Sequence, residues 1–336
     1  MTYINDPKID VSVCVCFFNV EKYLIKFLDS LFNQTIDKDI EYVFVDDGSL
    51  DDSHRILDSY LENIPSLKKQ NVKVVHNDSN KGLSASRNIA LKNSNGKYVT
   101  FVDADDWLEC NYLEELYDSA ENSAEDVDVV YCNYILEYKK ASIVKRLNRC
   151  STPQELLDFE FSSGQSMVWG KLFIRELFVQ NNILWNENIN MHEDLYITTM
   201  LLQKAKNISF VDKPLYHYVK YNMSSMTNDE FITSSKNNVI LVSSEIEKSL
   251  GADKSVTKSS LDAMKLEILI NAVMSAGKKD RHRFYDLFPE IKITSVFRVK
   301  KWNKIVFSIF YLLHLYFITD CLIFVRNWYV DNLNRS

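Results

Sequence analysis

Three aspartates lie within four residues, directly behind an apolar, strand-like segment of the chain. Asp103, Asp105 and Asp106 follow residues 97–102, and carboxylates this close repel one another unless something neutralises them. A hard divalent cation such as Mg²⁺ or Mn²⁺ takes one or two such carboxylates together with phosphate oxygens and water. An acidic turn that caps the following helix is the alternative, and this loop alone leaves both interpretations open.

Two further loops carry polar residues that suit a ligand with a base and phosphates. Asp47 ends the apolar run 40–45 and precedes Gly48, which permits a close approach of the backbone to a ligand. A carboxylate here can accept the N3–H of a uracil, although an Asx turn would also satisfy it. Arg87 is expected in the first turns of a helix that Ser84 caps, where it faces an anion or is simply solvated.

A second acidic pair opens an apolar helix much later in the sequence. Glu193 and Asp194 precede a run that includes Met200 to Leu202, so they lie at the positive end of the helix dipole. This position keeps a carboxylate ionised, as a general base requires. A capping acid with a purely structural role is the alternative.

The elements that must position these residues follow from the hydrophobic pattern. Residues 11–18, 40–45, 72–75 and 97–102 read as strands, and helical spacing follows the first two at 21–32 and 51–61. This alternation predicts an α/β fold with a doubly wound, mainly parallel sheet. The loops after Phe18, Val45 and Val102 then meet at the carboxyl ends of the strands, where ligands bind in such sheets.

Composition limits the classes of function. A chain of 336 residues that is 46% hydrophobic can bury a large core, and its formal charge of −7 excludes a general nucleic-acid binder. Six cysteines without CxxC spacing indicate reduced thiols in a cytoplasmic protein. Residues 1–10 are polar and acidic, so no secretion signal is expected there.

Taken together, the polar loops match one family over about the first 110 residues. The chain resembles the family-2 glycosyltransferases of the GT-A fold through VSVCVCFFN, YVFVDDGSLDDS, NKGLSASRNIAL and KYVTFVDADDWL. The resemblance implies a nucleotide-sugar donor and a Mn²⁺ or Mg²⁺ ion. It implies that the edge formed by Cys16, Phe17 and Asn19 holds the base together with Asp47. It also places Arg87 near the base or diphosphate, Asp103 and Ala104 near the ribose and metal, and Asp105 on the metal as its main ligand.

The resemblance extends to an acceptor-binding half. It implies that Asp194 is the catalytic base and that Glu193 orients the acceptor or the neighbouring loop. Trp169, in a segment similar to the family's W-x-K-L-[FY], would stack on a sugar face or lie in the core. Lys220 would screen the diphosphate, and His217 would complete the metal shell or remain a satisfied core residue.

The implied reaction is a single in-line displacement that inverts the anomeric centre of the donor, by family frequency a UDP-sugar. A sugar nucleotidyltransferase is the first alternative, but its Gly-rich phosphate loop is missing after the first strand, at residues 16–19. A catalytically inactive sugar-binding scaffold is the second. Such a protein would be expected to lack a carboxylate at the metal or base site, and both sites retain theirs.

The chain is expected to consist of four segments with different roles. Residues 1–110 would bind the nucleotide-sugar, 111–225 the acceptor and base, and 226–295 would form a helical extension. Segment 296–336 combines an apolar stretch with flanking tryptophans and a basic cluster: Arg298, Lys300, Lys301 and Lys304. Asp320 interrupts the stretch, which predicts helices on the inner membrane surface, near a lipid-linked or cell-surface glycan acceptor, rather than a span. Docking on the protein or pairing in a homo-oligomer is the alternative.

Overall fold

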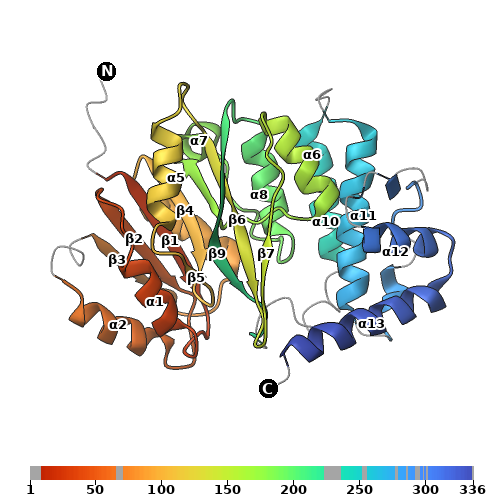
Figure 1. Cartoon of the computed structure of the whole chain (residues 1–336), viewed down its shortest axis with the longest axis horizontal. Coiled ribbons are helices and arrows are strands. Elements are labelled where there is room, and N and C mark those ends of the chain that lie inside the picture. The colour runs from red at the N-terminus through yellow and green to blue at the C-terminus, as the bar shows by residue number, and fades with distance from the viewer. Residues whose placement is uncertain are drawn as a thin grey trace.

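The computed structural model describes residues 9–65, 71–222, 236–251, 256–276, 279–284, 287–291, 296–297, 299 and 302–334. Within these residues, nine strands form one sheet, helices cover its faces, and the C-terminal helices pack beside it (Figure 1). The predicted α/β class with a helical C-terminal extension is confirmed.

The first four strands form the parallel part of the sheet in the order β3-β2-β1-β4. They are β1 (Val11–Phe17), β2 (Ile40–Asp46), β3 (Val72–His76) and β4 (Tyr98–Asp103). Every residue of β1 and β2 is buried, which explains why apolar residues predominate on both faces of these strands rather than alternating with polar ones. The pairing sets Cys16 beside both Val45 and Asp103, so these strands end at one edge, as predicted.

Four helices cover this part of the sheet from opposite sides. Val13 and Val15 share a core with α1 (Leu24–Phe32), α2 (Ser53–Asn63) and α5 (Tyr112–Glu121). Cys14 and Cys16 instead share a core with α4 (Leu83–Asn93). Because successive strand residues point to opposite faces, the strand sequence itself assigns each helix its side.

Beyond β4 the sheet becomes mixed. The strand β8 (Lys171–Ile174) pairs antiparallel with β4, and β6 (Val129–Glu137) pairs antiparallel with β8 and with β7 (Ser142–Lys145). Next comes β9 (Ile208–Val219), parallel to β6, and finally the short β5 (Trp107–Leu108). One sheet therefore continues across the predicted boundary at residue 110.

Apart from α7 (Arg175–Asn181), the remaining helices lie together beside this second half of the sheet (Figure 1). Three follow the strands: α6 (Pro153–Ser163), α7 and α8 (Glu193–Leu202). The C-terminal group contains α10 (Lys236–Leu250), α11 (Lys258–Ser275), the short 3₁₀ helix η1 (Arg281–Phe284), α12 (Trp302–Leu312) and α13 (Tyr316–Asn334). Their buried side chains join the core that α6 and α8 share with the sheet.

Two polar residues of the C-terminal segment point into the protein. Lys304 forms a buried ion pair with Glu267 of α11, and Asp320 binds Arg281 with Nη1 to Oδ1 at 2.6 Å. The prediction that Lys304 faces a membrane is therefore wrong, because it compensates a buried carboxylate. Arg298, Lys300 and Lys301 lie outside the described residues. Among the described helices, none is long and apolar enough to cross a membrane.

Candidate active site

The loops after β1 and β2 are joined by hydrogen bonds at the edge of the sheet. The Asp47 amide donates to the Phe17 carbonyl at 2.9 Å, and the Asn19 amide donates to Ser49 Oγ at 3.0 Å. Asn19 has a left-handed backbone, with φ 54°, and its Oδ1 accepts from the Leu50 amide at 2.8 Å. The two loops thus form one platform at the predicted base-binding edge.

Asp47 fixes the loop that leads to Arg87. Its buried carboxylate accepts from Asn77 Nδ2 at 2.8 Å and from the amides of Lys81 and Gly82, each at 2.9 Å. The Asx-turn alternative does not describe it, because these donors come from residues 30 to 35 positions away. Asp47 therefore holds two loops in place at the predicted base-binding edge.

Cys16 and Phe17 contribute backbone rather than side chains. Both are buried, and burial raises the pKa of the Cys16 thiol well above its usual range, so the thiol stays neutral. Ala104 is likewise buried in the core under the loop. Any contact of a nucleotide with these three residues would therefore run through main-chain atoms.

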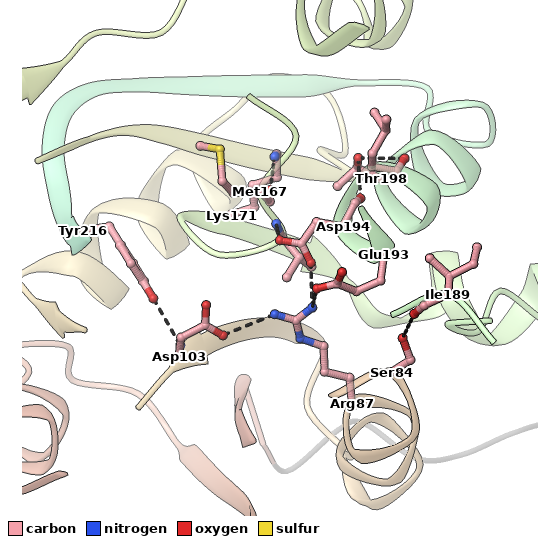
Figure 2. Close-up of polar contacts among 12 residues, drawn as sticks. Ser84, Arg87, Asp103, Met167, Lys171, Ile189, Glu193, Asp194, Thr198 and Tyr216 are labelled. Carbon is pink, nitrogen blue, oxygen red and sulfur yellow. Dashed lines mark hydrogen bonds and ion pairs between the residues drawn. The ribbon is translucent and has the colours of Figure 1, made fainter. Parts of the chain in front are cut away.

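Arg87 is the centre of the polar cluster shown in Figure 2. Its Nη1 lies 2.6 Å from Asp194 Oδ1 and 3.3 Å from Glu193 Oε1, while Nη2 lies 3.2 Å from Asp103 Oδ1. Only 3% of its side chain is exposed, so the solvated-arginine alternative is excluded. Arg87, from α4, thereby links Asp103 at the end of β4 to the acidic pair at the start of α8.

One guanidinium does not fully balance the three carboxylates around it. Burial raises the pKa of Glu193 to about 7, with Asp194 adding to the rise and Arg87 opposing it. Burial also raises the pKa of Asp103 to about 6, again against Arg87. The site has an excess of buried negative charge, which a further cation would relieve.

Asp194 is held through both carboxylate oxygens. Besides the Arg87 contact at Oδ1, its Oδ2 accepts from the Val168 amide at 3.1 Å. Ser84 of α4 donates to the Ile189 carbonyl at 3.0 Å and so ties down the loop before α8 (Figure 2). About a fifth of the Asp194 side chain remains exposed, which leaves room for a substrate hydroxyl to reach it.

Asp105 and Asp106, in the loop after β4, differ in their burial and in their hydrogen-bond partners. Asp106 is buried and accepts from Tyr216 OH at 2.8 Å and from the Val219 amide at 2.7 Å, so it is a structural acid that anchors β9. Asp105 is partly exposed and accepts from Asn222 Nδ2 at 2.7 Å. Burial raises the pKa of both carboxyl groups. The capping alternative fits neither acid, because the cap position of the next helix, α5, is occupied by Asn111.

A divalent ion fits the donor set at this loop. No group of three metal-binding side chains gathers anywhere within the described ranges. Mg²⁺ and Mn²⁺ do not need one when a substrate supplies phosphate oxygens, because one or two carboxylates then suffice. Asp105 and Asp103 would provide those carboxylates, and the charge of Asp105 contributes to the raised pKa of Asp103.

His217 does not complete this metal shell, contrary to prediction. Its Nδ1 lies 2.8 Å from Glu137 and its Nε2 lies 2.9 Å from Glu109, so both ring nitrogens already face carboxylates. The ring stacks on Trp107 at 4.9 Å. Strand alternation explains this orientation: Tyr216 faces the aspartate loop, and the next residue of β9 points to the other side.

Trp169 does not offer a face to a sugar. It is 5% exposed and stacks on Tyr216 with ring centroids 4.4 Å apart, while Tyr134 meets it edge-on at 5.1 Å. The core alternative is correct. The ring supports Tyr216, whose hydroxyl accepts from the Asp103 amide at 3.1 Å.

Lys220 lies close to the aspartate loop. Its Nζ donates to Tyr218 OH at 3.2 Å, and burial lowers its pKa against the opposing charges of Asp106 and Asp105. Two neighbours of these acids, Tyr216 and Asn222, were not among the predicted site residues. No local sequence pattern indicates a role for Asn222, because its partner, Asp105, is 117 positions away in the sequence.

The chain is similar in sequence to several proteins that are named as glycosyltransferases. Over 228 residues the chain is 31% identical to the "Uncharacterized glycosyltransferase EpsJ" of Bacillus subtilis, covering 65% of this chain and 62% of the relative. Over 238 residues it is 33% identical to the "Cholesterol galactosyltransferase" of Borreliella burgdorferi, covering 66% and 63%. The match thus spans less than two thirds of each relative's length.

Solved structures share the fold. S. aureus TarS 1-349 in complex with UDP-GlcNAc has a TM-score of 0.67 and 21% identity, covering 96% of this chain and 92% of that one. The mannosyltransferase PcManGT from Pyrobaculum calidifontis, in complex with GDP-Man and Mn²⁺, has a TM-score of 0.57 and 15% identity, covering 96% and 88%. The family model "Glycosyl transferase family 2" matches residues 12–179, half of the chain. The chain therefore belongs to glycosyl transferase family 2 and has a GT-A-like fold.

Proposed function

We propose that this protein transfers a sugar from a nucleotide-sugar to an acceptor hydroxyl with inversion of the anomeric centre. The observation that carries the proposal is the Arg87 cluster, which joins Asp103 on the donor side to Asp194 on the acceptor side within one ion-pair network. An inverting transfer needs a base for the incoming hydroxyl and charge compensation for the outgoing diphosphate at one centre. UDP-sugar is the proposed donor, in line with UDP-GlcNAc in the complex of TarS.

The residues divide the chemistry as follows. Asp194, fixed by Arg87 and the Val168 amide, removes the proton from the acceptor hydroxyl as that oxygen attacks the sugar. Asp105 and Asp103 would hold Mn²⁺ or Mg²⁺, which supplies Lewis-acid stabilisation of the departing diphosphate. Lys220, beside the same acids, adds a positive charge on the leaving-group side. Asp47 and the backbone of residues 16–19 hold the base.

We assign the donor to residues 1–110 and the acceptor and base to 111–225, with helical segments at 226–295 and 296–336. The acceptor would be a growing glycan or a lipid-linked sugar at the inner membrane surface. One relative is named for a membrane lipid, cholesterol. Glu193 would orient this acceptor or the loop beside it, since it borders Asp194 at the start of α8.

An exposed apolar stripe on α13 supports contact with a membrane surface. Phe317, Phe324 and Trp328 are 81%, 72% and 57% exposed, and their spacing of seven and four residues puts them on one side of the helix. Thr319 and Ile323 are buried on the other side. A helix that turns its aromatic face outward suits an interfacial position better than free solution.

The proposed function is tested by nucleotide-sugar hydrolysis across a panel of UDP-, GDP-, dTDP- and CMP-sugars, with Mn²⁺, Mg²⁺ or EDTA. Metal-dependent turnover of one donor class is expected. Asp105→Ala should abolish it and weaken UDP binding with Mn²⁺ by about tenfold or more, because Asp105 would hold the cation that compensates the charge of the diphosphate. Asp58→Ala, an exposed acid on α2, is the matched control. Binding of a donor without turnover under every condition would favour an inactive sugar-binding scaffold instead.

A further inference from the structure

A buried ion pair lies behind the proposed base and has no part in the mechanism above. Lys171 of β8 and Glu160 of α6 approach to 2.9 Å between Nζ and Oε1, and their side chains are 4% and 1% exposed. A buried pair of this kind seldom adds net stability over apolar residues of the same size, because both charges must be desolvated. Its presence at this position therefore calls for another explanation.

The ammonium group also reaches the loop that contacts Asp194. Lys171 Nζ donates to the carbonyl oxygen of Met167 (Figure 2). The next residue, Val168, donates its amide to Asp194 Oδ2 at 3.1 Å. Hence Arg87 holds one oxygen of the base directly, and Lys171 holds the other through a single peptide unit.

The loop is secured at both ends as well as at this central point. Gln165 Nε2 donates to Tyr134 OH at 2.9 Å, and the Gly170 carbonyl accepts from the Cys132 amide at 3.1 Å. Without an ammonium group, the Met167 carbonyl would lose its partner in a partly buried place, and the peptide would be free to rotate toward another partner. That rotation would carry the Val168 amide away from Asp194.

Glu160 explains how the Lys171 ammonium can lie near Asp194 without compensating the negative charge of that carboxylate. Its carboxylate cancels the charge of Lys171, and the pair presents Asp194 with little net charge. Burial raises the pKa of Glu160, Lys171 opposes the rise and Asp194 adds to it, so Glu160 lies within electrostatic reach of the base. The Lys171–Glu160 pair therefore positions the peptide that contacts Asp194, whereas Arg87 compensates the charge of Asp194.

We propose that Lys171 is a positioning residue for the catalytic base, acting on Asp194 through the Met167–Val168 peptide, with Glu160 as its counter-charge. This inference rests on the proposed function, since it takes Asp194 as the base. It predicts that loss of Lys171 lowers the rate of transfer while donor binding, which depends on the loops after β1, β2 and β4, stays intact.

The experiment compares Lys171→Met with the double variant Lys171→Met/Glu160→Leu. The single variant leaves Glu160 buried and unpaired, so both Tm and kcat should fall. The double variant removes both charges and should recover most of the Tm. Its kcat should remain about tenfold or more below the starting protein, with a donor KM within about twofold. Recovery of kcat together with Tm would overturn the proposal, because the pair would then be merely structural.

A matched control removes another lysine that pairs with a buried glutamate. Lys73→Met breaks the 2.7 Å contact with Glu41, which lies among the parallel strands, and should lower Tm but leave kcat unchanged below the unfolding transition. A similar kcat loss in this variant would mean that any weakening of the core reduces the rate, which also overturns the proposal. Asp194→Asn distinguishes failure of the Lys171 proposal from failure of the proposed function. If that variant stays active, Asp194 is not the base, and the proposed function fails with it.

Discussion

The two acids at the start of α8 share Arg87 but differ in their other contacts. Asp194 also receives the Val168 amide, whereas Glu193 has a pKa raised to about 7 by burial and by Asp194. The Glu193 carboxyl therefore holds a proton more readily than an ordinary glutamate does, and a glutamine resembles that neutral form. Both side chains are partly exposed, 15% for Glu193 and 20% for Asp194, so what distinguishes Asp194 is the Val168 amide that holds its second oxygen.

We therefore expect unequal effects from the two isosteric substitutions. Asp194→Asn should lower kcat by roughly a hundredfold or more with little change in donor KM, as for loss of a general base. Glu193→Gln, the matched comparison, should lower kcat by less than about tenfold. Steady-state kinetics at saturating donor measures both. The reverse order would assign the base to Glu193.

His192 precedes this pair and makes the fold sensitive to acid. It adopts a left-handed backbone with φ 60°, and burial lowers its pKa to about 4, with Lys304 contributing and Asp194 opposing. Between about pH 6.5 and pH 4 the unfolded chain binds this proton and the folded chain does not. Its contribution to the free energy of unfolding therefore falls as the pH falls through that window, by about 3 kcal/mol at most.

Replacing His192 by Asn should reduce this loss, because Asn tolerates the left-handed backbone and does not titrate there. Denaturant unfolding at pH 7 and pH 5 provides the measurement, and the difference between the two should shrink in His192→Asn. The exposed His282 serves as control, since His282→Asn should leave the difference unchanged. An equal pH dependence in all three proteins would show that His192 does not carry the effect.

At the level of loops, the turn after β2 depends on a glycine. Gly48 has φ +73°, and a Cβ there would lie 2.8 Å from the Ser79 carbonyl carbon and 3.0 Å from the Asn80 nitrogen. Both atoms are backbone and cannot swing aside. The clash would push apart the two loops that Asp47 joins.

Gly48→Ala should therefore weaken UDP binding by about tenfold or more, because the base-binding platform loses its geometry. Gly251→Ala is a control with similar backbone strain, since Gly251 also has positive φ but its Cβ would approach its neighbour only to 3.6 Å. Isothermal titration with UDP and Mn²⁺ compares the two. Equal affinities would show that the platform tolerates the displacement or does not bind the base.

At the scale of the whole molecule, α13 connects the exposed stripe to the active-site loops. Its last turn contacts the β6–β7 hairpin, where the Lys140 amide donates to the Leu333 carbonyl at 3.1 Å. Asn334 Nδ2 donates to the Lys220 carbonyl at 3.1 Å. A surface that binds α13 would therefore lie close to the segment that carries Lys220.

Replacing the stripe by Phe317→Ser, Phe324→Ser and Trp328→Ser should weaken sedimentation with anionic liposomes by about tenfold while donor hydrolysis persists. Substitution is preferable to truncation, because removal of Lys304 would leave Glu267 buried and unpaired. The control changes three exposed apolar residues elsewhere, Ile25, Val179 and Leu184, to Ser. If only the stripe variant shifts from dimer to monomer and liposome binding is unaffected, the stripe is a subunit interface.

Local sequence patterns determined the fold and the location of the site. Runs rich in apolar residues specify the four parallel strands, and polar residues gather after them, as at Asp47 and Asp103. Because parallel strands share one carboxyl edge, these loops had to meet. The motifs around them were enough to indicate the family.

Only the tertiary structure decided what each polar side chain meets. Arg87 contacts acids 16, 106 and 107 positions away, and Lys304 finds Glu267 across two helices, so no local pattern could distinguish a buried ion pair from a solvated cation. The direction of His217 depended on the pairing and register of β9, where one residue changes the face of the sheet, and the direction of Trp169 on its stacking against Tyr216. Partners distant in sequence are fixed by packing, which composition and spacing do not encode.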